Sequence, residues 1–221
     1  MEKTMTHSID LFWSFRSPYS YLAIRRIVEL TKEYDLDVNV RPVYPIAVRN
    51  PQFFKDIHPL WIDYLMTDLQ RVGEMNNIPI AWPRPDPVKM NRQTKEIPIE
   101  QPYIHRLTHL GVAAAEIGDG LAFLDKISNL IWSGEVRGWH EGGHLSKAAA
   151  DAGFDLAKLD DMIADRFDEY AAKVNENQEA LEKAGHWGVP TLAYNNEAFF
   201  GQDRVEVCLW RMNQDGLQER Q

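Results

Sequence analysis

The tetrapeptide Ser17-Pro18-Tyr19-Ser20 links two stretches of different periodicity. Before it, from Ile9 to Phe15, every second residue is apolar, which predicts a β-strand. After it, the apolar residues from Ser20 to Tyr34 fall on one side of a predicted helix. A serine at the N-cap accepts a backbone hydrogen bond, and a proline at the first helical position loses no needed donor. The sequence therefore predicts a strand that passes into a helix at Ser17.

A helix N-terminus at Ser17 would stabilise an anion, because it carries a partial positive charge and unpaired N–H groups. Thioredoxin-like oxidoreductases place Cys-x-x-Cys at such a junction, where this field lowers the pKa of the first cysteine. Here both ends of the tetrapeptide are serine. We infer that a ligand supplies the sulfur. The alternative is that Ser17 is only a helix cap.

The composition argues against a nucleic-acid-binding protein and against a membrane protein. A net charge of −9 over 221 residues argues against nucleic acid as a partner and gives no reason to expect a membrane surface. The single cysteine, Cys208, excludes an intramolecular disulfide and is expected to be a buried apolar residue. Residues 1–7 contain no apolar core of a signal peptide, and no stretch is long enough to span a membrane. We expect a cytoplasmic protein.

The periodicity predicts the remaining elements in order. A second strand, Leu36 to Val43, precedes a loop at residues 46–51. A long helix follows from Ile57 to Met75 and ends at Asn77, and residues 78–87 form a proline-rich loop in which Trp82 packs. Further helices are expected at residues 101–117, 121–131, 145–152 and 156–163, and a hairpin at residues 190–200. In the last helix, Asp203 is the expected N-cap, with Glu206 three residues later and a buried stripe of Val205, Cys208, Leu209 and Met212.

This order predicts an α/β fold. Residues 1–46 and 184–221 would form a thioredoxin-like domain, and residues 47–183 an all-helical domain inserted into it.

Four segments carry a resemblance to a known family. They are residues 12–23, FWSFRSPYSYLA; residues 63–71 with Ile78-Pro79; residues 188–191, GVPT; and residues 201–204, GQDR. With this spacing the chain resembles the 2-hydroxychromene-2-carboxylate isomerases, relatives of kappa-class glutathione transferases and DsbA-type oxidoreductases. The resemblance implies a thioredoxin-like fold with a helical insertion, a homodimer, glutathione as cofactor and isomerisation of a double bond.

The resemblance also implies roles for individual residues in glutathione binding. Ser17 corresponds to the serine that hydrogen-bonds the glutathione sulfur, and Val189 precedes the family's cis-proline, Pro190. Gln202 and Asp203, followed by Arg204, match the site for the γ-glutamyl end. Without the resemblance, Val189-Pro190 reads as the start of a strand and Asp203 as a helix cap.

Other positions concern the substrate. Asn50 matches an asparagine placed near the sulfur or the substrate, although it also suits a turn. Many relatives have a lysine where this chain has Trp61, so an anionic ligand loses one expected partner; His58 lies one helical turn earlier. Tyr19, Trp61 and Trp82 are expected to hold an aromatic substrate on flat apolar surfaces.

Metal sites are not expected, although two histidine patterns raise the question. Residues 140–144, HEGGH, fit the zinc-protease pattern, but two glycines at its centre disfavour the helix which that pattern needs. His105 and His109 are four residues apart on a predicted helix, and no third ligand is evident.

The expected function is therefore a glutathione-dependent cis–trans isomerase that acts on an aromatic ketoacid in aromatic-compound catabolism. The alternatives are a kappa-like glutathione transferase, a DsbA-family oxidoreductase-like protein, and a glutathione-binding module without turnover.

Overall fold

A computed structural model describes residues 7–91 and 93–220, so residues 1–6, whose sequence argues against a signal peptide, lie outside it. Its sheet contains β1 (His7–Trp13), β2 (Leu36–Pro42), β3 (Thr191–Tyr194) and β4 (Glu197–Phe200). The strand order is β2-β1-β3-β4. The pair β1–β2 is parallel, and the other two pairs are antiparallel. The predicted strands and the hairpin are confirmed, and the α/β class with them.

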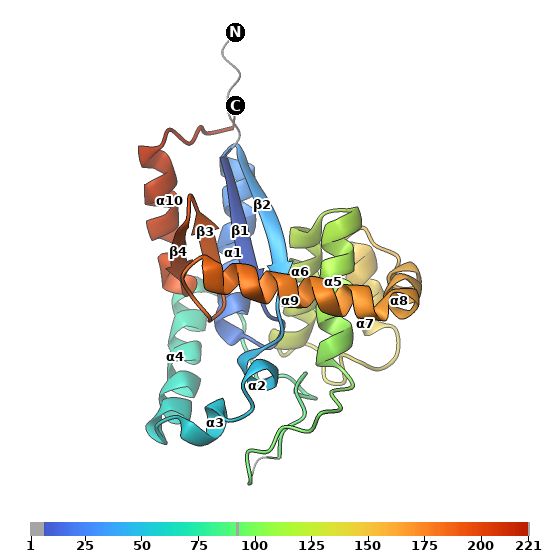
Figure 1. The fold of residues 1–221 in the computed structure, drawn as a ribbon. Helices are drawn as coiled ribbons and strands as arrows, with labels where there is room; N and C mark the ends of the chain where they lie inside the picture. The colour runs from blue at the N-terminus through green and yellow to red at the C-terminus, as the bar shows by residue number, and fades with distance from the viewer. Residues whose placement is uncertain (1–6, 92, 221) are drawn as a thin grey trace.

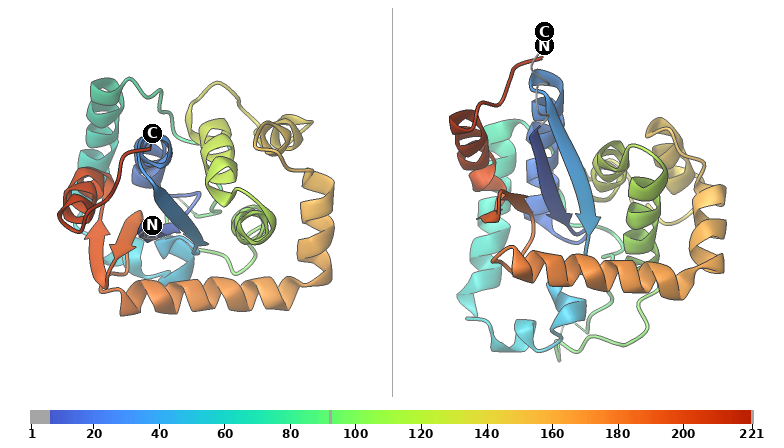
Figure 2. Two further views of the ribbon diagram at one scale, coloured as in Figure 1. Left: turned by 90° about the horizontal axis from the view of Figure 1, so that it is seen from above. Right: turned by 45° about the horizontal axis from the view of Figure 1, so that its top comes forward.

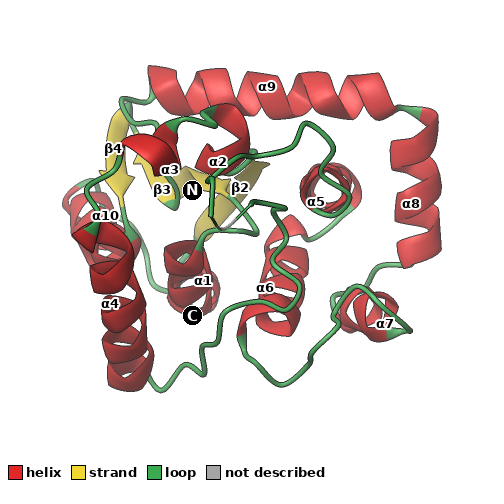
Figure 3. Ribbon diagram, turned by 90° about the horizontal axis from the view of Figure 1, so that it is seen from below, coloured by secondary structure: helices red, strands yellow, loops and turns green. Residues whose placement is uncertain are grey.

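Helices cover both faces of the sheet (Figures 1 and 2), and they bury residues of β1 on each face. Ile9, Leu11 and Trp13 belong to the main core, which also includes residues of α1 (Pro18–Glu33). Phe12 points to the other face and packs with Leu181 of α9 (Phe167–Lys183). Figure 3 shows α9 running along the side of the sheet opposite α1.

Helix α1 begins where the sequence predicts. Ser17 is its N-cap, and the Ser17 Oγ accepts a hydrogen bond of 3.2 Å from the backbone N–H of Ser20. Strand β1 ends at Trp13, two residues before the predicted end, because the chain turns there: the Ser14 carbonyl accepts from the Ser17 N–H.

The stretch that follows β2 differs from the prediction. Residues 46–51 are not a loop throughout: Ile46–Arg49 forms the short helix α2, and Phe53–Asp56 forms α3. The long helix α4 spans Leu60–Asn76 and therefore starts later than predicted. Pro59 explains this start, since the residue before a proline disfavours helical geometry and the proline itself suits a helix entrance. The predicted end is confirmed, with Asn77 in the left-handed conformation at φ 53°.

The helical part contains four further predicted helices, all confirmed: α5 (Ile104–Ile117), α6 (Gly120–Trp132), α7 (His144–Asp151) and α8 (Leu156–Asp165). Helix α9 was not predicted as a separate element. Only Tyr170, Val174 and Leu181 are fully buried along it, so its apolar stripe is too narrow to stand out among polar residues.

The expected cap of the last helix is wrong. A turn of 3₁₀ helix, η1 (Gln202–Arg204), precedes α10 (Val205–Gln214), so that Arg204 occupies the N-cap position. The Asp203 carboxylate makes no capping bond and instead pairs with Arg204 at 2.8 Å. The buried stripe of α10 is confirmed. Burial raises the pKa of the Cys208 thiol to about 12, which suits an inert core residue.

Sheet and helices share one core. Buried residues of β1, α1, α5, α6 and α10 belong to a single cluster, and Trp132 of α6 donates a 2.8 Å hydrogen bond to the carbonyl of Phe15. The division at residues 47 and 183 stays a prediction. None of the helices that the structure describes combines the length and apolar character needed to cross a bilayer.

In the described part of the chain, no three His, Cys, Asp or Glu side chains gather closely enough to hold a metal ion. The HEGGH segment is not a helix, because α7 begins only at His144. His109 is fully buried in the core, where its Nε2 lies 2.6 Å from the hydroxyl of Tyr44.

His109 should make the protein less stable in acid. Burial, with a smaller effect from His105, lowers its pKa to about 4, against about 6.5 in the unfolded chain. Between these values the unfolded state binds more protons, so the free energy of unfolding falls as pH drops from 6.5 to 4, by up to about 3 kcal/mol. Urea unfolding at pH 6.5 and 4.5 should show a smaller fall in His109→Gln, which retains an acceptor for Tyr44. Equal falls in both proteins would contradict this role.

Candidate functional site

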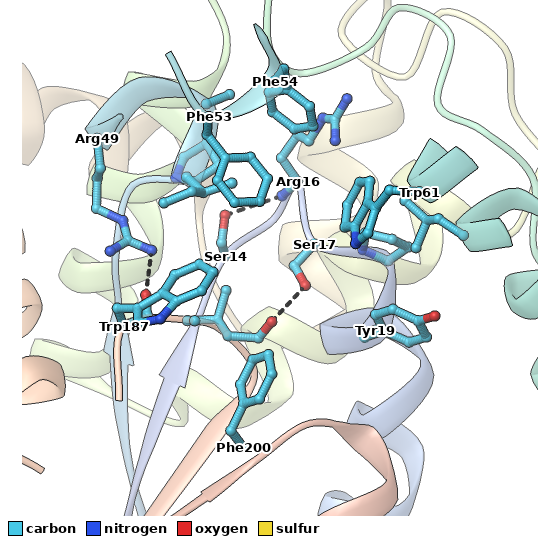
Figure 4. A pocket seen from close by; sticks show the side chains of 17 residues that line it. Ser14, Arg16, Ser17, Tyr19, Arg49, Phe53, Phe54, Trp61, Trp187 and Phe200 are labelled. Carbon is cyan, nitrogen blue, oxygen red and sulfur yellow. Dashed lines mark hydrogen bonds between the residues drawn. The ribbon is translucent and has the colours of Figure 1, made fainter. Parts of the chain in front are cut away.

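A cavity of about 290 Å³ opens where α1 begins, between α2, α3, α4 and the segment before β3 (Figure 4). Its walls are mainly apolar, with several aromatic rings, and polar groups are few. The lining includes Ser14, Arg16, Ser17, Tyr19, Arg49, Phe53, Phe54, Trp61, Trp187, Val189 and Phe200. A cavity of this kind suits a flat apolar ligand that is oriented by a few polar contacts.

Ser17 presents its hydroxyl at this cavity. Its Oγ donates a 3.1 Å hydrogen bond to the carbonyl of Val189 while it accepts from the N–H of Ser20. The two segments that meet here are 172 residues apart in the chain. The peptide bond between Val189 and Pro190 is cis, as the resemblance implies. The hydroxyl proton thus rests on a carbonyl that a bound peptide backbone could take over.

Arg16 lies beside Ser17 but its charge is neutralised. Its guanidinium donates to both carboxylate oxygens of Asp86, at 3.1 and 3.0 Å, and lies 4.6 Å from the ring centroid of Trp82. Trp82 itself donates to Asp86 at 3.1 Å. These contacts fix the loop that carries Trp82 and Asp86 against the start of α1.

Arg49, at the end of α2, lines another part of the same cavity. It donates to two backbone carbonyls, those of Tyr44 at 2.7 Å and Trp187 at 2.9 Å. Burial lowers its pKa from the ordinary value, and the carboxylate of Glu182 acts in the opposite sense. A poorly solvated cation therefore faces the apolar cavity.

A second cavity, of about 550 Å³, adjoins the first, since Tyr19, Val189 and Phe200 line both. Pro190, Gln202, Asp203 and Arg204 line this second cavity together with Asp68. The Tyr19 hydroxyl donates to Asp68 at 2.6 Å, and burial followed by this contact raises the pKa of Tyr19. Tyr19 therefore stays protonated and serves as a wall between the two cavities.

The structure thus brings most of the predicted site residues together. Ser17, Tyr19 and Trp61 line the first cavity, and Val189 links it to the second. Two predicted residues, Asn50 and Trp82, line neither cavity. Asn50 is exposed, and its side chain accepts a hydrogen bond from the N–H of Gln52. The ring of Trp82 packs on the guanidinium of Arg16. Their predicted roles in ligand binding stay predictions.

Sequence reasoning missed Arg49, Phe53, Trp187 and Phe200 as cavity residues. Trp187 directly precedes the GVPT segment, and this position in the sequence could have indicated that Trp187 lies at the site. Gly188 in that segment shows why glycine stands there: a Cβ would lie 2.5 Å from the ring of Phe200. No pattern marked the other three, because they come from separate elements that meet only in the fold.

The sequence profile of the DSBA-like thioredoxin domain matches residues 8–212, nearly the whole chain. The chain belongs to this family. In this chain the candidate site lies at the junction of β1 and α1, which carries Ser17 and Ser20.

Relatives of this DSBA-like protein include an isomerase. The chain is 23% identical over 201 residues to the 2-hydroxychromene-2-carboxylate isomerase of Pseudomonas sp. (strain C18), covering 89% of this chain and 86% of that one. A solved 2-hydroxychromene-2-carboxylate isomerase has the same fold, with a TM-score of 0.70, 20% identity, and coverage of 94% and 95% of the two chains. The cytosolic disulfide reductase DsbM of Pseudomonas aeruginosa, solved with GSH, aligns with a TM-score of 0.58, 15% identity, and coverage of 94% and 99%.

Proposed function

We propose that this DSBA-like protein is a glutathione-dependent cis–trans isomerase that acts on an aromatic ketoacid in the breakdown of aromatic compounds. The observation that carries the proposal is the Ser17 hydroxyl. It lies at the N-terminus of α1, faces an aromatic cavity and bonds to the Val189 carbonyl. A site of this kind favours a thiolate supplied by a ligand.

The residues around Ser17 fit glutathione. The backbone of Val189, before the cis-proline, offers a peptide partner, and the sulfur would lie at Ser17. The exposed carboxylate of Asp203, free of any capping role, suits the ammonium of the γ-glutamyl end, and Gln202 and Arg204 suit its carboxylate. Glutathione would then occupy the second cavity, with its sulfur at Ser17, and the aromatic substrate would occupy the adjoining first cavity.

When bound, glutathione supplies a thiolate that adds reversibly to a conjugated carbon and so permits rotation about the former double bond. The protein's own residues prepare this chemistry. If the amide of the ligand bonds to the Val189 carbonyl, the Ser17 hydroxyl is released and can donate to the sulfur. Tyr19 stays protonated and bound to Asp68, so it orients the ligand rather than transferring protons.

A glutathione transferase is the second candidate, since it would need the same thiolate and the same cavity. A dithiol oxidoreductase is disfavoured, because Ser17 and Ser20 replace both cysteines and Cys208 is buried in the core. The GSH in the DsbM structure supports glutathione binding in a protein of this fold. A cytoplasmic location and a homodimer stay predictions.

Asp203→Asn should weaken glutathione binding about tenfold, because an ammonium loses its charged partner. Calorimetric titration with glutathione would measure the change. Asp151→Asn is the matched control, since Asp151 forms an exposed salt bridge with Lys147 on α7 and its loss should leave affinity unchanged. Equal affinity in wild type and Asp203→Asn would remove Asp203 from the site, and absence of glutathione binding to the wild type would contradict the proposed function.

A further inference from the structure

The first cavity is positively charged although the chain carries a net charge of −9. Of the described residues that line it, Arg16 and Arg49 bear charge, and both are cations. Asp86 compensates Arg16 through two hydrogen bonds. Within residues 7–91 and 93–220, the hydrogen bonds of Arg49 go to two neutral carbonyls, and no carboxylate forms a salt bridge with it. Arg49 is therefore the cation of the cavity that no described carboxylate contacts, although the charge of Glu182 acts on it from a longer distance.

The geometry of Arg49 suits a ligand. A guanidinium has five N–H donors, and the bonds to Tyr44 and Trp187 use two of them. These bonds hold the planar group in place before any ligand arrives, which lowers the entropy lost on binding. Figure 4 shows Arg49 on the other side of the cavity from Trp61 and Tyr19, with Ser17 between them. Trp187 lies next to Arg49 on the cavity wall, and the centroid of its ring is 5.9 Å from that of Phe53.

We propose that Arg49 determines specificity by binding the carboxylate of a planar aromatic ligand, whose ring packs on the apolar surface that Phe53 and Trp187 form together. The side chain of Trp61 on the opposite wall has no charge, so Arg49 fixes which way the ligand enters. The acid end is held at α2 and the rest of the molecule extends toward Ser17. This inference rests on the proposed function, in which Arg49 would recognise the acid group of the substrate. Binding of the acid itself requires no glutathione, so it can be measured separately.

The test is calorimetric binding of 2-naphthoate and its neutral counterpart 2-naphthamide without glutathione. The wild type should bind the acid more tightly than the amide. Arg49→Met should weaken binding of 2-naphthoate about tenfold to a hundredfold, the range for hydrogen bonds to a charged group, and leave 2-naphthamide unchanged. Arg49→Lys should recover part of the loss. Arg25→Met is the matched control, because it removes an exposed charge that pairs with Glu29 on α1.

Three outcomes would overturn the proposal. If Arg49 only braced the two carbonyls, the variant would bind both probes less well, or both as before. If its natural partner were a carboxylate of glutathione, Arg49→Met would weaken glutathione binding and leave 2-naphthoate unaffected. If the wild type bound neither probe, the cavity would not be an aromatic acid site, whatever the result with glutathione.

Discussion

Ser17→Ala is expected to raise the pKa of glutathione bound to the protein and to slow turnover about tenfold to a hundredfold. The variant loses a hydrogen bond to an anion, worth about 1.5–3 kcal/mol. The helix N-terminus and the backbone of Val189 remain, so glutathione affinity should fall less than turnover. Titration of the thiolate absorbance of the complex with pH measures the effect directly. Since stabilisation of the thiolate lowers its pKa, the wild-type curve should lie at lower pH.

Loss of the cap needs a control, because Ser17→Ala also removes the N-cap bond to Ser20, which costs about 1 kcal/mol of stability. Asp155→Ala removes the equivalent cap from α8, where Asp155 accepts from the N–H of Ala157 away from both cavities. It should be destabilised to a similar degree with an unchanged thiolate titration. Superimposable curves for wild type and Ser17→Ala would exclude Ser17 from the mechanism.

Asp86→Ala is expected to destabilise the protein by about 3–5 kcal/mol, since it leaves the nearly buried cation of Arg16 unpaired. Among the described residues, Asp86 accepts four hydrogen bonds: two from Arg16, one from Trp82 and one from the N–H of Val88. They tie the proline-rich loop to the start of α1, so the variant should also bind aromatic ligands less well.

Urea unfolding would measure the loss of stability. Asp151→Ala serves as the control, since it breaks an exposed pair with Lys147 and should cost about 0.5 kcal/mol or less. Equal unfolding free energies for Asp86→Ala and the wild type would show that the other contacts of the loop hold it without Asp86.

The local signals in the sequence were sufficient for much of the fold. Ser17 and Pro18 mark a helix start through chemistry that needs no distant partner, and the alternation in β1 reveals a pleated strand. Helix α9 shows no broad apolar stripe in the sequence, because only three of its residues are fully buried: Leu181 packs with Phe12, and Tyr170 and Val174 belong to the main core. Asp203 looked like a cap because its spacing to Glu206 fits a capping box, but a 3₁₀ turn inserts before α10.

For the site, the sequence indicated residues that occur in short motifs, such as Ser17 and Val189. It did not indicate Arg49, whose position in the cavity depends on a hydrogen bond to the carbonyl of Trp187, 138 residues later in the chain. Pairings of this range follow from the topology of the sheet and from the packing of α2, which no local periodicity encodes.

The most direct test of the proposed isomerase measures product and glutathione in one sample. A conjugated aromatic ketoacid in hundredfold excess over glutathione is incubated with the protein, and the two geometric isomers and the free thiol are quantified by NMR. We predict that the isomers reach equilibrium, that no conversion above background occurs without glutathione, and that all of the thiol is recovered. Consumption of the thiol into a conjugate or a disulfide, or isomerisation at the same rate without glutathione, would contradict the account.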